Sequence, residues 1–188
     1  MNVTPTAIAG VVLVEPRVFR DPRGYFLTTF HQEAFRAAGL PAAFVQDNHS
    51  FSAQRGILRG MHAQLTQPQG KLVRAVVGEV FDVAVDLRPD SPTFGTWVGE
   101  VLSETNFRQL YVPPGCAHGF YVLSDTAHVE YKCTALYAPA DEIGLVWDDP
   151  DVGIGWPAGP PPVVNDRDGS WPRLAELRPR LEAYRGMV

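Results

Sequence analysis

The stretch Val80-Phe81-Asp82-Val83-Ala84-Val85-Asp86-Leu87-Arg88 decides the fold class. Its large apolar residues alternate with small or charged ones, and an alternation of period two is typical of a β-strand. Similar short runs extend along the chain and are separated by turn-like breaks such as Asp21-Pro22-Arg23-Gly24. The pattern predicts an all-β protein, a β-sandwich of the jelly-roll type. Its further strands are expected at 11–19, 25–30, 44–51, 56–64, 71–77, 97–102, 109–112, 119–123, 128–136 and 145–147.

Helical signal is limited to two places. One is the segment 32–38, which Gly39 ends, and the other is a C-terminal segment at about 173–185, which Pro179 interrupts. A chain of 188 residues is the size of one domain. The proline- and glycine-rich stretch 153–162 is too short to be an interdomain linker. We therefore expect a single domain over residues 1–188.

Composition excludes several classes of protein and partner. The longest apolar run, 7–14, is far shorter than the roughly 20 residues that a membrane-spanning helix needs. The first residues lack the pattern of a secretory signal, which predicts a cytoplasmic protein without a membrane partner. The net charge is -5 and the basic residues are scattered, which argues against a nucleic-acid partner.

Metal and cofactor chemistry is not expected. Metal-binding jelly-roll enzymes carry a His-x-His pair on one strand, whereas the corresponding stretch here, Arg59-Gly60-Met61-His62-Ala63-Gln64, has one histidine. The chain also lacks the phosphate-binding, dinucleotide-binding and nucleophile-elbow motifs. What remains is acid–base or nucleophilic catalysis by side chains, with no cofactor.

Three chemically active side chains fall on apolar strand faces. Tyr131 alternates in step with apolar neighbours, His62 shares a face with a glycine that leaves room for its ring, and Lys71 lies on an apolar face too. An inward ammonium needs a nearby anion, for which Asp82 or Asp86 could serve. For Tyr131 and His62, a structural hydrogen bond and a contact with a ligand both remain open at this point.

These residues belong to long motifs that follow one another in unbroken order. In them the chain closely resembles the dTDP-4-dehydrorhamnose 3,5-epimerase family, from about Phe19 to Pro172. The motifs are Leu58-Arg59-Gly60-Met61-His62-Ala63-Gln64, Gly70-Lys71-Leu72-Val73-Arg74, Gly78 to Arg88, Ser91-Pro92-Thr93-Phe94-Gly95, Pro114-Gly115-Cys116-Ala117-His118-Gly119-Phe120, Tyr131-Lys132-Cys133-Thr134 and Trp147-Asp148-Asp149-Pro150.

The resemblance implies a cupin-type jelly roll, a homodimer that exchanges N-terminal strands, no metal, and a nucleotide-sugar substrate. It implies an isomerase that inverts C3 and C5 of dTDP-4-dehydro-6-deoxy-D-glucose to give dTDP-4-dehydro-L-rhamnose. Carried over by motif, His62 is the base, Tyr131 the opposing acid, and Asp168 orients the histidine. The implied substrate-binding residues are Arg23, Gln46, Asn48, Arg59, Lys71, His118, Glu142 and Arg167.

Two departures leave alternatives open. Thr28 stands where the family usually has a glutamate, so an epimerase acting on only C3 or C5, or a ketoisomerase, remains an alternative. A sugar-binding jelly roll without catalysis is a third hypothesis, which the joint presence of an acid and a base disfavours. Strict alternation would place Arg59 and His62 on opposite faces. A bulge near Gly60, or a site shared between subunits, is therefore expected.

Overall fold

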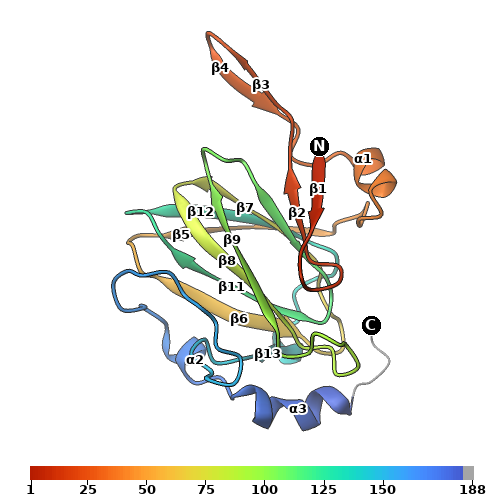
Figure 1. Cartoon of the computed structure of the whole chain (residues 1–188), viewed down its shortest axis with the longest axis vertical. Coiled ribbons are helices and arrows are strands. Elements are labelled where there is room, and N and C mark those ends of the chain that lie inside the picture. Colours follow the sequence, from red (N-terminus) through yellow and green to blue (C-terminus); the bar gives the residue numbers. More distant parts are fainter. Residues whose placement is uncertain (184–188) are drawn as a thin grey trace.

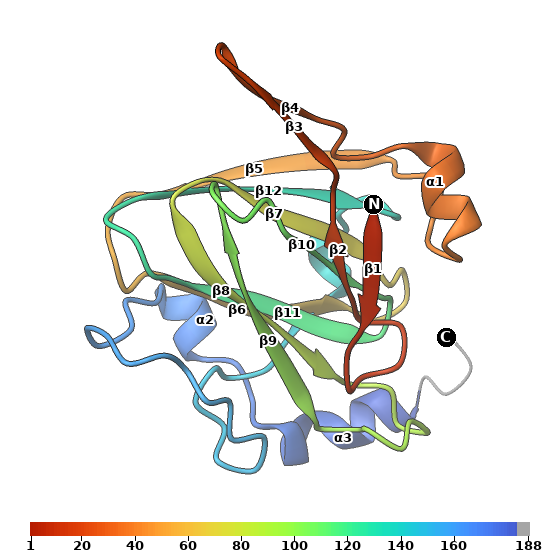
Figure 2. The same ribbon diagram turned by 45° about the horizontal axis from the view of Figure 1, so that its top comes forward.

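Two antiparallel β-sheets face each other in the computed structural model, which describes residues 1–183. The six-stranded sheet has the order β1 (Asn2–Pro5), β2 (Val12–Glu15), β10 (Gln109–Val112), β7 (Lys71–Val77), β12 (Ala127–Cys133) and β5 (Gln46–Ser52). The five-stranded sheet has the order β13 (Glu142–Gly144), β6 (Leu58–Gln64), β11 (Cys116–Val122), β8 (Glu79–Asp86) and β9 (Trp97–Ser103). This arrangement, seen in Figures 1 and 2, confirms the all-β jelly-roll prediction.

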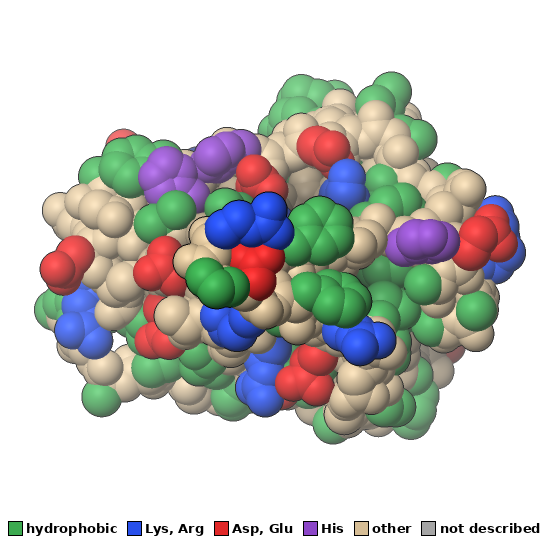
Figure 3. All heavy atoms as spheres, turned by 90° about the horizontal axis from the view of Figure 1, so that it is seen from above, with side chains coloured by type: hydrophobic (Ala, Val, Ile, Leu, Met, Phe, Trp, Pro, Cys, Tyr) green, Lys and Arg blue, Asp and Glu red, His purple; other side chains and the backbone are tan. Residues whose placement is uncertain are grey.

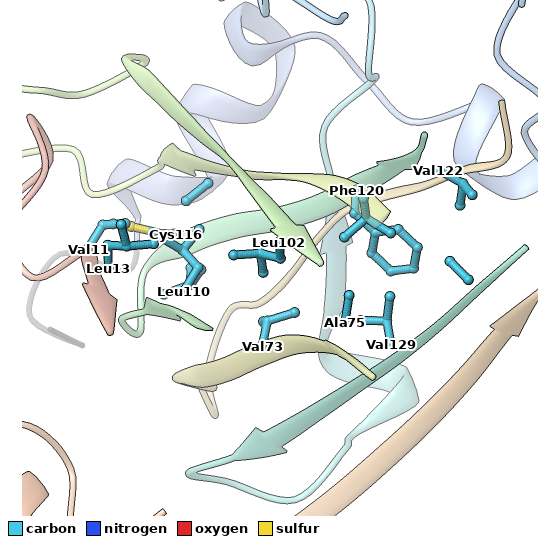
Figure 4. Packing of buried hydrophobic residues seen from close by; sticks show 14 of the residues in the cluster. Val11, Leu13, Val73, Ala75, Leu102, Leu110, Cys116, Phe120, Val122 and Val129 are labelled. Carbon is cyan, nitrogen blue, oxygen red and sulfur yellow. The ribbon is translucent and has the colours of Figure 1, made fainter. Parts of the chain in front are cut away.

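The space between the sheets holds the first hydrophobic cluster. Side chains such as Val73 and Val129 from the six-stranded sheet meet Leu102 and Phe120 from the other sheet (Figure 4). These residues come from the inward positions of alternating strands, as a sandwich requires.

Helices cover the outer face of each sheet. Leu177 and Leu181 of α3 (Leu174–Glu182) join a second cluster against the five-stranded sheet. Phe35 of α1 (Gln32–Ala37) joins a third cluster, against part of the six-stranded sheet. Strand β8 is consequently buried on both faces, and its alternate residues Asp82 and Asp86 are fully buried.

A two-stranded hairpin of β3 (Val18–Asp21) and β4 (Gly24–Leu27) projects from the body of the molecule (Figures 1 and 2). Its pairing closes at the turn that the sequence predicted, with Asp21 opposite Gly24. Figure 3 views the molecule from this end, where hydrophobic and basic side chains gather near the middle of the surface. The hairpin contributes to neither of the two sandwich sheets.

Several predicted elements are corrected. The strand expected at 145–147 lies at β13 instead. Strand β1 and the one-turn helix α2 (Asp166–Gly169) were not predicted. A 3₁₀ turn, η1, spans Pro139–Asp141. The expected strand 11–19 is divided between β2 and β3. Helix α3 continues through Pro179, and the rest of the expected 173–185 helix, from 184 on, lies outside the described residues. Within residues 1–183, no helix has both the length and the apolar character needed to cross a membrane.

Candidate active site

A polar cavity of about 320 Å³ is lined by strands of both sheets and by α2. Of the eleven site residues that the sequence analysis names, ten line it. They are His62, Tyr131, Asp168, Gln46, Asn48, Arg59, Lys71, His118, Glu142 and Arg167. A group of candidates from many parts of the chain therefore meets at one place.

His62 of β6 and Asp168 of α2 form a hydrogen-bonded pair, with 2.8 Å between Nε2 and Oδ1. The other carboxylate oxygen accepts the backbone N–H of Gly60 at 3.0 Å, and Asn165 caps the helix by accepting the N–H of Asp168. Burial alone would raise the pKa of Asp168, but the hydrogen bonds from His62 and Gly60, with the neighbouring positive charges, hold it below its usual value. A carboxylate at Nε2 requires a proton there, which leaves Nδ1 as the basic nitrogen.

A β-bulge brings Arg59 and His62 to the same cavity. His118 of β11 pairs with His62, while Phe120, two residues further on, pairs with Arg59, three residues before His62. The extra residue lies around Gly60, whose φ of +122° favours glycine. A side chain at Gly60 would also come within 2.6 Å of the α-carbon of Gly119. The expected bulge is thus present, and it overrides strict alternation.

Tyr131 reaches the cavity from β12, in the sheet opposite His62. Its strand neighbours on the same face, Val129 and Cys133, are fully buried, as the alternation predicted. Burial raises the pKa of the Tyr131 hydroxyl, so it is protonated at neutral pH. Within residues 1–183 this hydroxyl has no hydrogen-bond partner, which leaves it available to a ligand.

Lys71 of β7 is a buried cation at the same cavity. Its Nζ donates to the backbone carbonyl of His62 at 3.3 Å. Burial lowers the pKa of Lys71, and the neighbouring Cys133, Glu142 and Asp82 oppose this effect. Of the two anions expected beside Lys71, Asp82 contributes, but the expectation for Asp86 is wrong. The Asp86 carboxylate instead accepts hydrogen bonds from Arg88, Ser91 and Thr93, in the loop that follows β8.

A second histidine–aspartate pair lies beside the first. His118 Nε2 is 2.8 Å from Oδ1 of Asp82, which is fully buried. The Oδ2 atom of Asp82 has no partner among the described residues. His118 therefore presents Nδ1 to the cavity from a ring fixed by a buried carboxylate.

Arginines and polar side chains complete the lining. Arg167 donates to Glu142 at 2.6 Å, and Tyr137 donates to the same carboxylate oxygen at 3.3 Å. Arg59 is held by the backbone carbonyl of Phe51 at 2.9 Å. Gln46 donates to Asn48 at 3.0 Å. The guanidinium groups can bind the anionic part of a ligand, and the amide groups can bind its hydroxyl groups.

Sequence reasoning missed several lining residues, namely Ser50, Ala63, Gln64, Gln69, Gly119, Phe120 and Asn165. Gln64 was detectable, because it lies two residues from His62 on one strand. Its amide bonds the backbone of Leu136 and Ala138, and so it fixes the loop that carries Tyr137. The part of the chain that the structure describes contains no cluster of three or more His, Cys, Asp or Glu residues suited to a metal ion.

Arg23 is the exception among the named residues. It lies at the turn of the projecting hairpin, where its side chain is 90% exposed and, among residues 1–183, bonds only the nearby Asp21. Thr28, just after β4, is exposed as well. Neither residue lines the cavity of its own chain.

Comparison with known proteins places the chain in a family. The sequence model of the dTDP-4-dehydrorhamnose 3,5-epimerase family matches residues 5–176. The protein of that name from Pseudomonas aeruginosa is 56% identical over 169 residues, which are 89% of this chain and 93% of the relative. A dTDP-4-dehydrorhamnose 3-epimerase from Streptomyces niveus is 42% identical, over 95% of this chain and 86% of its own.

The fold agrees with this assignment. The crystal structure of dTDP-6-deoxy-D-glucose-3,5-epimerase from Legionella pneumophila, in complex with dTDP-4-keto-L-rhamnose, superposes with a TM-score of 0.92. It is 44% identical to this chain, and the match covers 96% of each chain. The chain therefore belongs to the dTDP-4-dehydrorhamnose 3,5-epimerase family of isomerases.

Proposed function

We propose that this enzyme inverts C3 and C5 of dTDP-4-dehydro-6-deoxy-D-glucose and so forms dTDP-4-dehydro-L-rhamnose. One observation carries the proposal: a base and a protonated hydroxyl, His62 and Tyr131, enter one cavity from opposite sheets. C3 and C5 both flank the C4 carbonyl, so their protons are acidified. Inversion requires that a proton leave one face of the sugar and return to the other, which two opposed groups achieve without turning the sugar over.

The first step is removal of a proton. His62 Nδ1 takes the proton from C3 or C5, and the C–H electron pair moves into an enolate whose negative charge rests on the C4 oxygen. Asp168 holds the ring and stabilises the imidazolium that forms. Lys71 is the cation best placed to stabilise the enolate oxygen.

The second step is proton return. The Tyr131 hydroxyl gives its proton to the carbon from the opposite face, and the enolate collapses to the ketone. The imidazolium and the phenolate then exchange the proton through solvent, which restores both groups for the second carbon. No step requires a cofactor.

The remaining lining residues bind the nucleotide portion in this proposal. Planar guanidinium groups match the oxygens of a diphosphate, and Arg59 and Arg167 are available for it. Gln46, Asn48 and Glu142 supply the hydrogen bonds that orient the sugar and the base.

We also propose a homodimer in which each hairpin serves the cavity of its partner. The support is the exposed hairpin itself, which carries Arg23 and three half-exposed or exposed aromatic side chains, Phe19, Tyr25 and Phe26. Exposed aromatic groups beside an arginine are typical of an interface. Arg23 would then contact the substrate of the partner subunit.

A mixing experiment tests the shared site. Arg23→Ala and His62→Ala chains, each weakly active alone, are unfolded together and refolded as an equal mixture. Activity should recover to roughly one quarter of wild type, because half the dimers are mixed and each has one complete site. No recovery would mean that Arg23 acts within its own chain, and full activity of the Arg23→Ala enzyme alone would mean that Arg23 has no role.

The function is tested by NMR of the 4-keto-6-deoxyglucose nucleotide in deuterated water. Exchange and inversion at both C3 and C5 are expected. Inversion at C3 alone would instead support the alternative of an epimerase that acts on one carbon. Thr28 and the similarity to a 3-epimerase are the reasons for testing that alternative. Absence of exchange at either carbon would contradict the proposed function.

A further inference from the structure

An indole outside the cavity packs behind the proposed base. Trp171 lies just after α2, beyond its C-cap Ser170, and its ring centroid is 6.3 Å from that of His62 at an interplanar angle of 74°. The Arg167 guanidinium carbon lies 5.9 Å from the centre of the same indole. An edge-to-face contact and a cation–π contact at these distances are both favourable. Trp171 therefore touches two groups of the site without lining it.

The indole of Trp171 occupies the space that a side chain at Gly144 would fill. A β-carbon at Gly144 would lie 2.1 Å from Cδ2 of Trp171, so the ring packs directly on the α-carbon of Gly144. Gly144 is also the register partner of His62 on β13. Its φ lies outside the region that favours glycine, so the space for the indole, not the backbone conformation, requires this glycine.

Asp168 lies on the same short segment as Trp171. Helix α2 has only four residues, and after it the chain is tied to the segment that follows β13 by the hydrogen bond from Val146 N–H to the Pro172 carbonyl at 3.0 Å. The bond to Asp168 and the longer contact with Arg167 both meet the imidazole at Nε2, so neither fixes rotation of the ring about that nitrogen. The Trp171 edge removes this freedom on one side of the ring.

We propose that Trp171, seated on Gly144, is a positioning residue that fixes the orientation of His62 and Asp168. The inference rests on the proposed function, because it assigns His62 as the base. A displacement of about 1 Å at a catalytic group can cost about 100-fold in rate. The contact should therefore matter for kcat more than for substrate binding.

A double-mutant cycle tests the pair. Trp171→Ala removes the indole, and Gly144→Ala forces it from its seat. Each change should lower kcat at least tenfold with KM within threefold, and the double variant should be no slower than the slower single variant. Trp156→Phe is the matched control, since that tryptophan is also partly buried but bonds the Trp147 carbonyl, away from the cavity. It should lower the melting temperature while kcat stays within twofold.

A spectroscopic readout covers the case in which Trp171→Ala fails to fold. Protonation of an adjacent imidazole quenches indole fluorescence, so the wild-type emission should fall as His62 gains a proton. Both Trp171→Phe and His62→Gln should abolish this pH-dependent change, and Trp171→Phe should have a kcat between those of wild type and Trp171→Ala.

Three results would overturn the proposal: wild-type kcat in the Trp171 and Gly144 variants, multiplicative effects in the double variant, or an unchanged fluorescence titration in Trp171→Phe. The wild-type enzyme in the deuterium-exchange assay separates this failure from failure of the proposed function. Normal exchange at both carbons with unaffected variants removes only the role of Trp171.

Discussion

The cavity contains two histidine–aspartate pairs that look alike and differ in their surroundings. His62 and His118 are register partners on β6 and β11, and each has Nε2 at 2.8 Å from a carboxylate. The His62 side chain is 22% exposed and both oxygens of Asp168 are bonded, whereas the His118 side chain is 7% exposed and Asp82 has one oxygen without a described partner. The same two residue types therefore form one partly exposed pair and one buried pair.

The difference indicates a division of labour. A base must gain and lose a proton during each turnover, which requires access to substrate and a carboxylate that stays charged throughout. Asp168 fits because two donors hold it. A deeply buried pair is costly to disturb, so His118 is better suited to hold a fixed orientation and to accept a hydrogen bond from a substrate hydroxyl through Nδ1. Burial and second partners decide the role, not the identity of the pair.

The largest expected effect comes from removing the first histidine. His62→Ala should lower deuterium exchange at both C3 and C5 by about 10² to 10⁴, the range for loss of a general base, while the affinity for dTDP changes only a few-fold. NMR exchange and calorimetric titration measure the two quantities. His118→Gln is the comparison variant, and it should retain at least ten times the exchange of His62→Ala. Equal losses in the two variants would break the distinction between the pairs.

The next effect separates the base from the acid. Tyr131→Phe keeps the ring and removes the hydroxyl, so deprotonation by His62 should survive while inversion falls by about 10²-fold. The variant should incorporate deuterium with retained configuration faster than it forms the inverted sugar. Both rates are measured by NMR on one sample. An unchanged ratio of exchange to inversion would make Tyr131 a structural residue and point to solvent or the Tyr137 hydroxyl as the proton source.

Local pattern predicted much of the sandwich and part of the site. Alternation predicted the strands around β8 and the inward direction of Tyr131 and Lys71, because both properties depend on period-two geometry. The conflict between Arg59 and His62 even predicted the bulge. Asp168, in contrast, lies 106 positions from His62, and only the family resemblance indicated it.

Other features depend on tertiary packing that no local pattern encodes. Strand β13 includes Glu142 and Gly144, two residue types that are depleted in strands, so the local pattern favours the more strand-like 145–147 instead. Pro179 predicted an interruption of the last helix, but the burial of Leu177 and Leu181 keeps the helix continuous. The seat of Trp171 on Gly144 joins residues far apart in sequence and has no sequence signal of its own.

A smaller effect concerns stability and compares the two carboxylates. The folded-state pKa of Asp168 is depressed, so its charge stabilises the fold above the unfolded pKa of about 3.9, and this contribution is lost as the pH falls through the folded value. Asp168→Asn should therefore lower the free energy of unfolding by about 1.5 kcal/mol at pH 7, and by less in acid.

Asp82→Asn should cost less than about 1 kcal/mol, because it keeps an acceptor for His118 and removes a buried charge with an unpaired oxygen. Urea unfolding at pH 7 and at pH 3.5 measures both variants. A larger loss of unfolding free energy in Asp82→Asn than in Asp168→Asn would contradict the view that Asp168 is the better stabilised of the two carboxylates.

Removal of metal ions is expected to have no effect on activity. It tests the alternative hypothesis that the two histidines bind one metal ion together. Two histidines side by side, each with Nε2 on a carboxylate, also resemble metal ligands, because a metal-bound histidine commonly donates its other N–H to a carboxylate. A metal between them would make the pairs one unit instead of two. Against this, the described residues offer no group of three ligands, and the Lys71 cation lines the same cavity and would repel a metal ion. Prolonged treatment with EDTA and phenanthroline should therefore leave kcat unchanged. If chelation inactivates the enzyme and zinc, iron or manganese restores it, the two histidines act as joint ligands, and their separate roles as base and hydrogen-bond acceptor must be abandoned.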